Sequence, residues 1–136
     1  MVKDKNPQDD FGRTPLHYAA ENGHLDIAKM ILDMVVEKNP KDHRGDTPLH
    51  DAAKVGHRDI VKMILDVVEE KNPKNDYGTT PLHFAAEKNQ PRICEIILPL
   101  VDEKNPTNSY GATPLSWAKS FGHVQVCDMI RLFIKK

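Results

Sequence analysis

The chain has 136 residues, of which 39% are hydrophobic and 29% charged, and its formal net charge is −1. This length is typical of one domain, and the composition excludes a disordered chain and a nucleic-acid binder held by bulk charge. No apolar run reaches the ~18–20 residues of a membrane span, and the N-terminal Met-Val-Lys-Asp-Lys is no signal peptide. We therefore expect a soluble intracellular protein, cytoplasmic or nuclear, without a membrane or nucleic-acid partner.

Two short motifs recur along the chain with one spacing of 33 residues. The first is Thr-Pro-Leu-His at Thr14, Thr47 and Thr80, which returns as Thr-Pro-Leu-Ser at Thr113. The second is Lys-Asn-Pro at Lys38, Lys71 and Lys104, with an earlier copy at Lys5. A fixed period of this size predicts stacked copies of one supersecondary unit, each of which buries its apolar face against its neighbours.

The first unit predicts two helices separated by a tight turn. Thr14 is a good N-cap and Pro15 an ideal first helical residue, and Gly23 follows as a natural helix stop. The stretch before Thr14, Asp-Asp-Phe-Gly, has the chemistry of a turn. A second helix is then predicted from the helical spacing of Leu25, Ile27, Ala28, Ile31, Leu32 and Val35.

The segment Gly-Arg-Thr-Pro-Leu-His-Tyr-Ala-Ala-Glu-Asn-Gly-His-Leu-Asp-Ile, residues 12–27, resembles the ankyrin repeat almost position for position, and the resemblance covers essentially the whole chain. It implies an all-α solenoid of helix-turn-helix units joined by hairpin loops. We expect a tail of a preceding repeat at 1–8 and repeats at 9–41, 42–74, 75–107 and 108–136. The last of these is expected to cap the C-terminal end, because Lys119 and Arg131 replace the alanine and leucine of earlier units.

Three departures from the ankyrin pattern carry structural predictions. The Gly-Ala-Asp that usually follows the second helix is missing, so we expect that helix to run about one turn longer, until Pro40, Pro73 or Pro106 ends it. In the third unit Asn89 replaces the glycine between the helices and is expected to take its left-handed conformation. Pro91 fits the first turn of the second helix, whereas Pro99 should shorten or kink that helix.

Histidines and cysteines are explained by the repeat rather than by chemistry. Six of the seven histidines recur in two fixed positions, and the resemblance implies that His17, His50 and His83 tie adjacent loops together. No spacing matches a zinc site, a phosphate-binding loop or a nucleophile with its base, so we predict no catalytic residue, no metal and no cofactor. Cys94 and Cys127 occupy one repeat position and are predicted to be free thiols in the core.

The resemblance also implies where a partner binds, because ankyrin arrays generally use the hairpin tips and the exposed side of the first helices. Seven of the eight Phe, Tyr and Trp residues fall in these positions, and aromatic side chains are common anchors of interfaces. The alternative is that these rings only shield the short first helices. The predicted contact residues are Phe11, Tyr18, Arg44, Asp46, Asp51, Tyr77, Phe84, Tyr110, Trp117 and Phe121.

The Lys-Asn-Pro copies leave two interpretations open. Asn39, Asn72 and Asn105 close the second helix and enter the hairpin, or they resemble the asparagines modified by the asparaginyl hydroxylase that regulates hypoxia-inducible factor. We therefore predict a monomeric, non-catalytic scaffold that binds an unidentified protein partner. The alternatives are a substrate of that hydroxylase and a structural spacer within a larger ankyrin protein.

Overall fold

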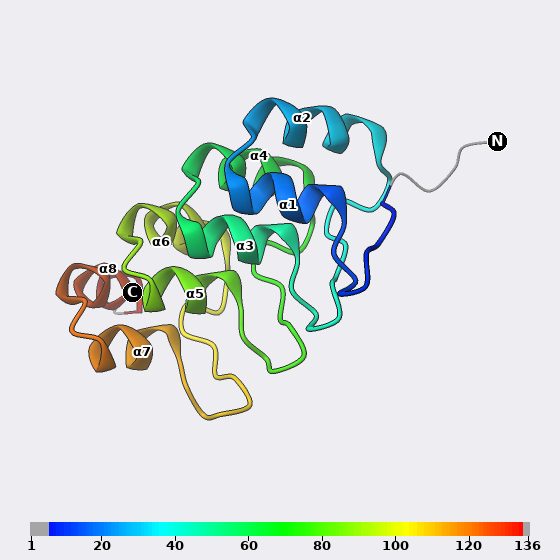
Figure 1. Ribbon diagram of the computed structural model, residues 1–136. Coiled ribbons are helices and arrows are strands. Elements are labelled where there is room, and N and C mark those ends of the chain that lie inside the picture. Colours follow the sequence, from blue (N-terminus) through cyan, green and yellow to red (C-terminus); the bar gives the residue numbers. More distant parts are fainter. Residues whose placement is uncertain (1–5, 135–136) are drawn as a thin grey trace.

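The computed structural model describes residues 6–134, which form an all-α stack of four helix-turn-helix pairs (Figure 1). The predicted fold class is confirmed, and none of the described residues forms a strand. The helices are α1 (Pro15–Asn22), α2 (Leu25–Met34), α3 (Pro48–Val55), α4 (Arg58–Val67), α5 (Pro81–Glu87), α6 (Pro91–Ile97), α7 (Pro114–Ser120) and α8 (Val124–Ile134), with a 3₁₀ turn at Leu98–Leu100. Within 6–134, no helix is long and apolar enough to span a bilayer.

The first helix of every pair starts with the same capping arrangement. The threonine hydroxyl, on Thr14 in the first unit, accepts the backbone N–H of the third helical residue, and that residue's side chain accepts the threonine N–H in return. Thr47, Thr80 and Thr113 repeat this arrangement, each followed by a proline. The prolines lose nothing there, since the first N–H of a helix has no intrahelical partner.

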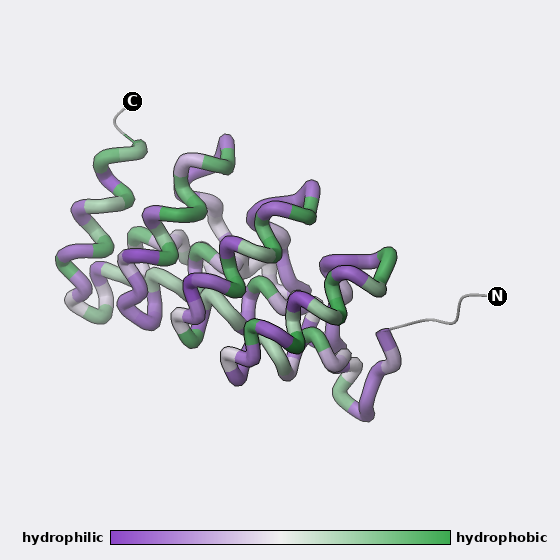
Figure 2. The backbone as a smooth tube through the Cα atoms, turned by 90° about the horizontal axis from the view of Figure 1, so that it is seen from above, coloured by the Kyte–Doolittle hydropathy of each residue, from purple (hydrophilic) through white to green (hydrophobic). Residues whose placement is uncertain are grey.

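The helix pairs stack side by side, and the core lies between successive pairs. First helices contact first helices and second helices contact second helices from one unit to the next. Figure 2 shows the pairs following one another in a single row. Small alanines let the first helices approach closely, and Ala20, Ala53 and Ala86 are fully buried. Leu16, Leu49 and Leu82, each one residue after a proline, are fully buried too.

The prediction that the second helix runs a turn longer is wrong. α2 ends at Met34 and α4 at Val67, and the next residues, Val35 and Val68, have extended backbones and buried side chains. The lysine of each Lys-Asn-Pro motif replaces the missing glycine stop. The Lys38 ammonium donates to the carbonyls of Leu32 and Val35, at 2.6 Å from the first, and so satisfies oxygens that the helix end leaves open.

The predictions for the third unit are confirmed. Asn89 has φ 57°, the left-handed conformation that glycines take between the helices of the other units. Pro91 is the first residue of α6. The helix ends early, at Ile97, and Pro99 lies within the 3₁₀ turn that follows, because a proline cannot donate to the helical ladder.

The fourth unit exposes side chains at positions that the earlier units bury. Lys119 and Arg131 are exposed where Ala86 and Leu98 are buried, and Leu115 is only half-buried whereas Leu82 is fully buried. Both cysteines are free and buried, as predicted, and burial raises the pKa of the Cys94 thiol to about 12. The division into repeats and the role of the fourth unit as a cap stay predictions, and residues 1–5 of the expected tail lie outside the described residues.

Candidate partner-binding surface

The hairpin tips form a ladder that holds four exposed residues in one row. In each tip the side-chain oxygen of an Asp or Asn accepts two backbone N–H groups. Asp42, for example, accepts the N–H groups of Arg44 and Asp46. Backbone bonds then join neighbouring tips, with the Asp76 N–H donating to the Arg44 carbonyl at 2.9 Å. The tips approach so closely that a Cβ on Gly45 would lie 2.7 Å from the backbone nitrogen of Asp76. The row of tips is therefore pre-organised before any partner binds.

The side chains of this row are mostly aromatic. Phe11 and Tyr110 are each 70% exposed, and Tyr77 is about half exposed. The Tyr77 and Tyr110 rings stack, with centroids 5.9 Å apart and planes 22° apart. Arg44 separates Phe11 from this pair and is also exposed. Exposed aromatic rings on a rigid backbone offer a partner a large contact area at little entropic cost.

A second aromatic row runs along the first helices, and it has two roles. Phe84 and Trp117 are half-buried, and each makes a T-shaped contact with a buried histidine. The ring centroids of His50 and Phe84 are 5.8 Å apart, and those of His83 and Trp117 are 5.3 Å apart. The two rings lie 6.5 Å from each other, and Phe121 beyond them is exposed. These rings therefore shield the histidines and also leave aromatic surface open to solvent.

The predicted structural role of the histidines is confirmed, and it fixes their protonation. The Thr47 N–H donates to Nδ1 of His50 at 3.0 Å, so Nδ1 carries no proton, and Nε2–H donates to the Thr79 carbonyl at 2.9 Å. His17 and His83 likewise each accept the N–H of the threonine in their own unit at Nδ1 and donate from Nε2 to a carbonyl of the following unit. Burial lowers the pKa of all three, that of His50 to about 3, and each is a neutral tie between units.

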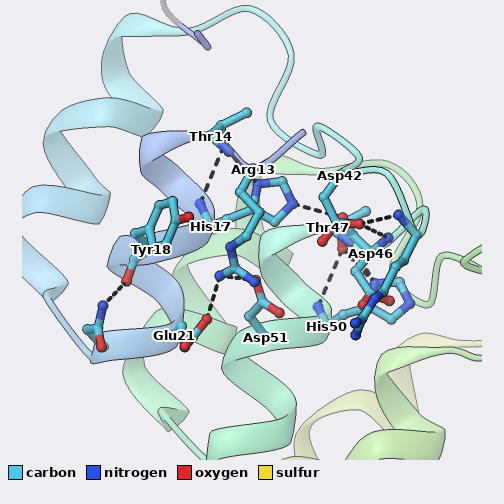
Figure 3. Close-up of polar contacts among 12 residues, drawn as sticks. Arg13, Thr14, His17, Tyr18, Glu21, Asp42, Asp46, Thr47, His50 and Asp51 are labelled. Atoms are coloured by element: carbon cyan, nitrogen blue, oxygen red, sulfur yellow. Dashed lines mark hydrogen bonds and ion pairs between the residues drawn. The ribbon is translucent and has the colours of Figure 1, made fainter. Parts of the chain in front are cut away.

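Arg13 binds two carboxylates and a ring at the start of the array. Its guanidinium lies 2.5 Å from Glu21 and 3.2 Å from Asp51, and it sits over the Tyr18 ring at 4.6 Å (Figure 3). Tyr18 in turn donates its hydroxyl to Asp9. Burial raises the pKa of Asp51 to about 7, even though Arg13 opposes that shift. The cluster joins α1, through Glu21 and Tyr18, to α3, through Asp51.

Two of the predicted contact residues are not accessible. Asp46 and Asp51 are each only 5% exposed. Asp51 lies beneath Arg13, and the Asp46 carboxylate accepts the side-chain N–H of Asn75 at 2.9 Å. Both acids hold neighbouring units together, so we leave them out of the contact surface. Asp51 shares its position in the repeat with Tyr18, Phe84 and Trp117, which are at least partly exposed, whereas the position of Asp46 is also buried at Thr79.

One residue near the aromatic rings was missed from the sequence. The Lys54 ammonium lies over the Phe84 ring, 4.4 Å from its centroid. Lys54 comes seven residues after Thr47, and the same offset gives Glu21 and Glu87 in neighbouring units. An alignment of the charged residues, as well as the aromatic ones, at the 33-residue period would have identified Lys54. Lys54 thus adds a positive charge to the edge of the aromatic surface.

The asparagines of the Lys-Asn-Pro motifs are half-buried and hydrogen-bonded. Asn72 accepts the Leu82 N–H and Asn105 accepts the Leu115 N–H, both at 3.1 Å, so each fixes the start of the following first helix. Asn39 instead donates to the Glu70 carbonyl at 3.2 Å. This supports the interpretation that they close the loop, and their hydroxylation stays a prediction.

A groove lies on the side of the second helices. It has a volume of about 1090 Å³ and runs between the ends of those helices and the segments that lead to the hairpins. Its walls combine apolar residues such as Val67 and Leu100 with acids and lysines such as Glu70 and Lys74. Among residues 6–134, no three His, Cys, Asp or Glu side chains lie together as they would to hold a metal ion.

The repeated geometry matches a known family. The family model for ankyrin repeats (3 copies) matches residues 1–75 and again residues 66–135, so the chain belongs to the ankyrin-repeat family. A comparison with curated proteins gave no match. Ankyrin repeats generally mediate protein–protein interaction, and the family is generally non-catalytic.

Proposed function

We propose that this chain is a non-catalytic recognition module that binds a protein partner through an aromatic strip on units three and four. The aromatic strip consists of Tyr77, Phe84, Tyr110, Trp117 and Phe121. The observation that carries the proposal is the stacked Tyr77–Tyr110 pair, exposed on the hydrogen-bonded hairpin tips. Such rings are typical anchors of protein interfaces, where a few residues dominate the binding energy.

Three further residues extend the surface toward the start of the chain. Phe11 and Arg44 continue the row of hairpin tips, and Tyr18 continues the row on the first helices. Arg13 already occupies the face of Tyr18 that would otherwise receive a cation. We therefore expect these three residues to contribute less to affinity than the aromatic strip does.

Affinity purification tests the proposal. The immobilised chain is compared with a Tyr77→Ala/Tyr110→Ala variant. Phe11→Ala is the control, since Phe11 is a ring in the same repeat position and is as exposed as Tyr110. The double variant is expected to lose the specifically bound protein while Phe11→Ala retains it. Circular dichroism checks that all three forms stay folded. Retention of the same protein in equal amount by a folded double variant would refute the proposal.

A further inference from the structure

The groove beside the second helices is built from the same positions of successive units. Val67 and Leu100 line it from one repeat position, and Glu37, Glu70 and Glu103 line it from another. Its lining includes none of the residues of the aromatic strip. Because equivalent positions of neighbouring units line it, the groove runs along the stack. A site of this kind suits a length of polypeptide better than a compact small molecule.

Exposed apolar side chains form a row along this groove. Val67 and Leu100 are about half exposed, and so is Met34, which holds the same repeat position in the first unit. We call Met34, Val67 and Leu100 the apolar row. Val36, which also lines the groove, is almost fully exposed. A position that faces water in three units and is apolar in all three offers a partner surface that binding can remove from water.

Carboxylates line the groove beside the apolar row. We call Glu37, Glu70 and Glu103 the acid row. All three are exposed, and each accepts the backbone N–H of the asparagine two residues later, at distances from 2.8 to 3.3 Å. Glu69 and Asp102 line the groove next to them and are exposed too. Within residues 6–134 none of these five carboxylates forms an ion pair, so each is open to a cation from a partner.

The lysines of the groove offset only part of this negative charge. Lys38 and Lys71 are half-buried, and the ammonium group of each is bound to two carbonyls at a helix end. Lys41 and Lys74 are the exposed lysines among the lining residues, and Lys41 donates to the Lys74 carbonyl. Five exposed carboxylates therefore line the groove together with two exposed ammonium groups.

We propose that this groove is a second docking site, separate from the aromatic strip, which binds a basic, extended segment of a partner protein. Aliphatic side chains of that segment pack on the apolar row, and its lysines or arginines pair with the acid row. Packed helices lie ~8–10 Å apart, and a polyproline-II chain advances ~9 Å in each turn of three residues. An aliphatic residue at every third position of the segment therefore meets one member of the apolar row in each unit.

A peptide of four Leu-Lys-Pro triplets tests the site directly. It is titrated into the isotope-labelled full chain, and the amide resonances are followed by NMR. We expect saturable shifts in segments 34–38, 67–71 and 100–104, and none with a peptide of four Leu-Glu-Pro triplets. Absence of binding, equal binding of the two peptides, or shifts confined to the hairpin tips and first helices would overturn the proposal.

Charge substitutions separate binding in the groove from general attraction between opposite charges. Glu70→Gln/Glu103→Gln keeps the hydrogen-bond acceptors but removes two charges of the acid row, and should weaken the Leu-Lys-Pro peptide by about fivefold at low salt. The control Asp26→Asn/Asp59→Asn removes two exposed charges at the starts of α2 and α4 and should change the affinity by less than about twofold. Equal weakening in both variants would contradict a site in the groove.

A second substitution tests the apolar row. Val67→Ser should weaken the peptide by about fivefold, whereas the control Val55→Ser, at a similarly exposed valine that ends α3, should not. Tyr77→Ala/Tyr110→Ala should bind the peptide as the unmodified chain does, which keeps this test distinct from that of the aromatic strip. Circular dichroism checks that each variant is folded. Loss of peptide binding in the folded tyrosine variant, or unchanged affinity in Val67→Ser, would show that the peptide does not occupy the groove and would overturn the proposal.

Discussion

At the residue scale, two buried groups respond to pH in opposite directions. The pKa of His50 is lowered to about 3, so below pH 6.5 this side chain binds a proton in the unfolded chain but not in the folded one. The free energy of unfolding therefore falls as the pH drops from 6.5 toward 3. The pKa of Asp51 is raised to about 7, so the folded chain binds a proton that the unfolded carboxyl, with its pKa near 4, does not. Protonation of Asp51 therefore adds stability as the pH falls from about 8 to 4 and opposes the histidines.

The Asp51→Asn variant should remove this opposing contribution. The free energy of unfolding of the unmodified chain, minus that of the variant, is expected to rise by roughly 2–3 kcal/mol between pH 8 and pH 5. Denaturant titrations at both pH values measure it. Asp59→Asn, at an exposed position of α4, is the control. A difference that stays constant with pH would show that the Asp51 carboxyl titrates alike in both states.

The residue scale also shows why two predicted contacts are buried. A repeat alignment places Asp51 at the position of Tyr18, Phe84 and Trp117, which are all at least partly exposed. Asp51 is hydrogen-bonded to Arg13, 38 residues earlier, and Asp46 to Asn75, 29 residues later. A pattern within one unit predicts which slot a side chain occupies. It does not predict which neighbouring side chain covers that slot.

At the element scale, helix starts could be predicted from the sequence, whereas the ends of the second helices could not. Each Thr-Pro pair acts locally, through a hydroxyl and a missing N–H, and every predicted start is found. The ends of α2 and α4 depend on a lysine side chain that folds back over six residues to reach a carbonyl. Helix propensity and proline positions contain no information about that contact.

The lysine contact predicts a cost for its removal. Lys71 donates to the carbonyls of Leu65 and Val68, and Lys71→Met removes the charge while keeping most of the apolar stem. We expect a loss of about 1–2 kcal/mol in the free energy of unfolding, as for other hydrogen bonds made by charged groups. Urea titration measures it. Lys62→Met, exposed on α4, should cost less than half as much, and equal costs would disprove the capping role.

At the scale of the whole molecule, stability comes from the contacts between units. The buried core runs without interruption from Leu16 to Ile130, and each unit's helices contact those of its neighbours. Cutting the chain after Pro73 should therefore leave two halves that each lack a folded neighbour, and stacks of fewer than three repeats are usually unstable. Neither half should show a cooperative thermal transition by circular dichroism. Two halves that each melt cooperatively at the midpoint of the full chain would contradict this.

The central claim is that exposed rings bind the partner whereas buried leucines hold the stack together. Its most direct test measures partner affinity and the free energy of unfolding for Tyr110→Ala and Leu82→Ala, at positions 70% and 0% exposed. Tyr110→Ala should weaken binding by about 2 kcal/mol and change stability by less than about 0.5 kcal/mol. Leu82→Ala should cost about 2–5 kcal/mol of stability. If Tyr110→Ala destabilises the fold as much as Leu82→Ala and leaves affinity intact, the account is contradicted.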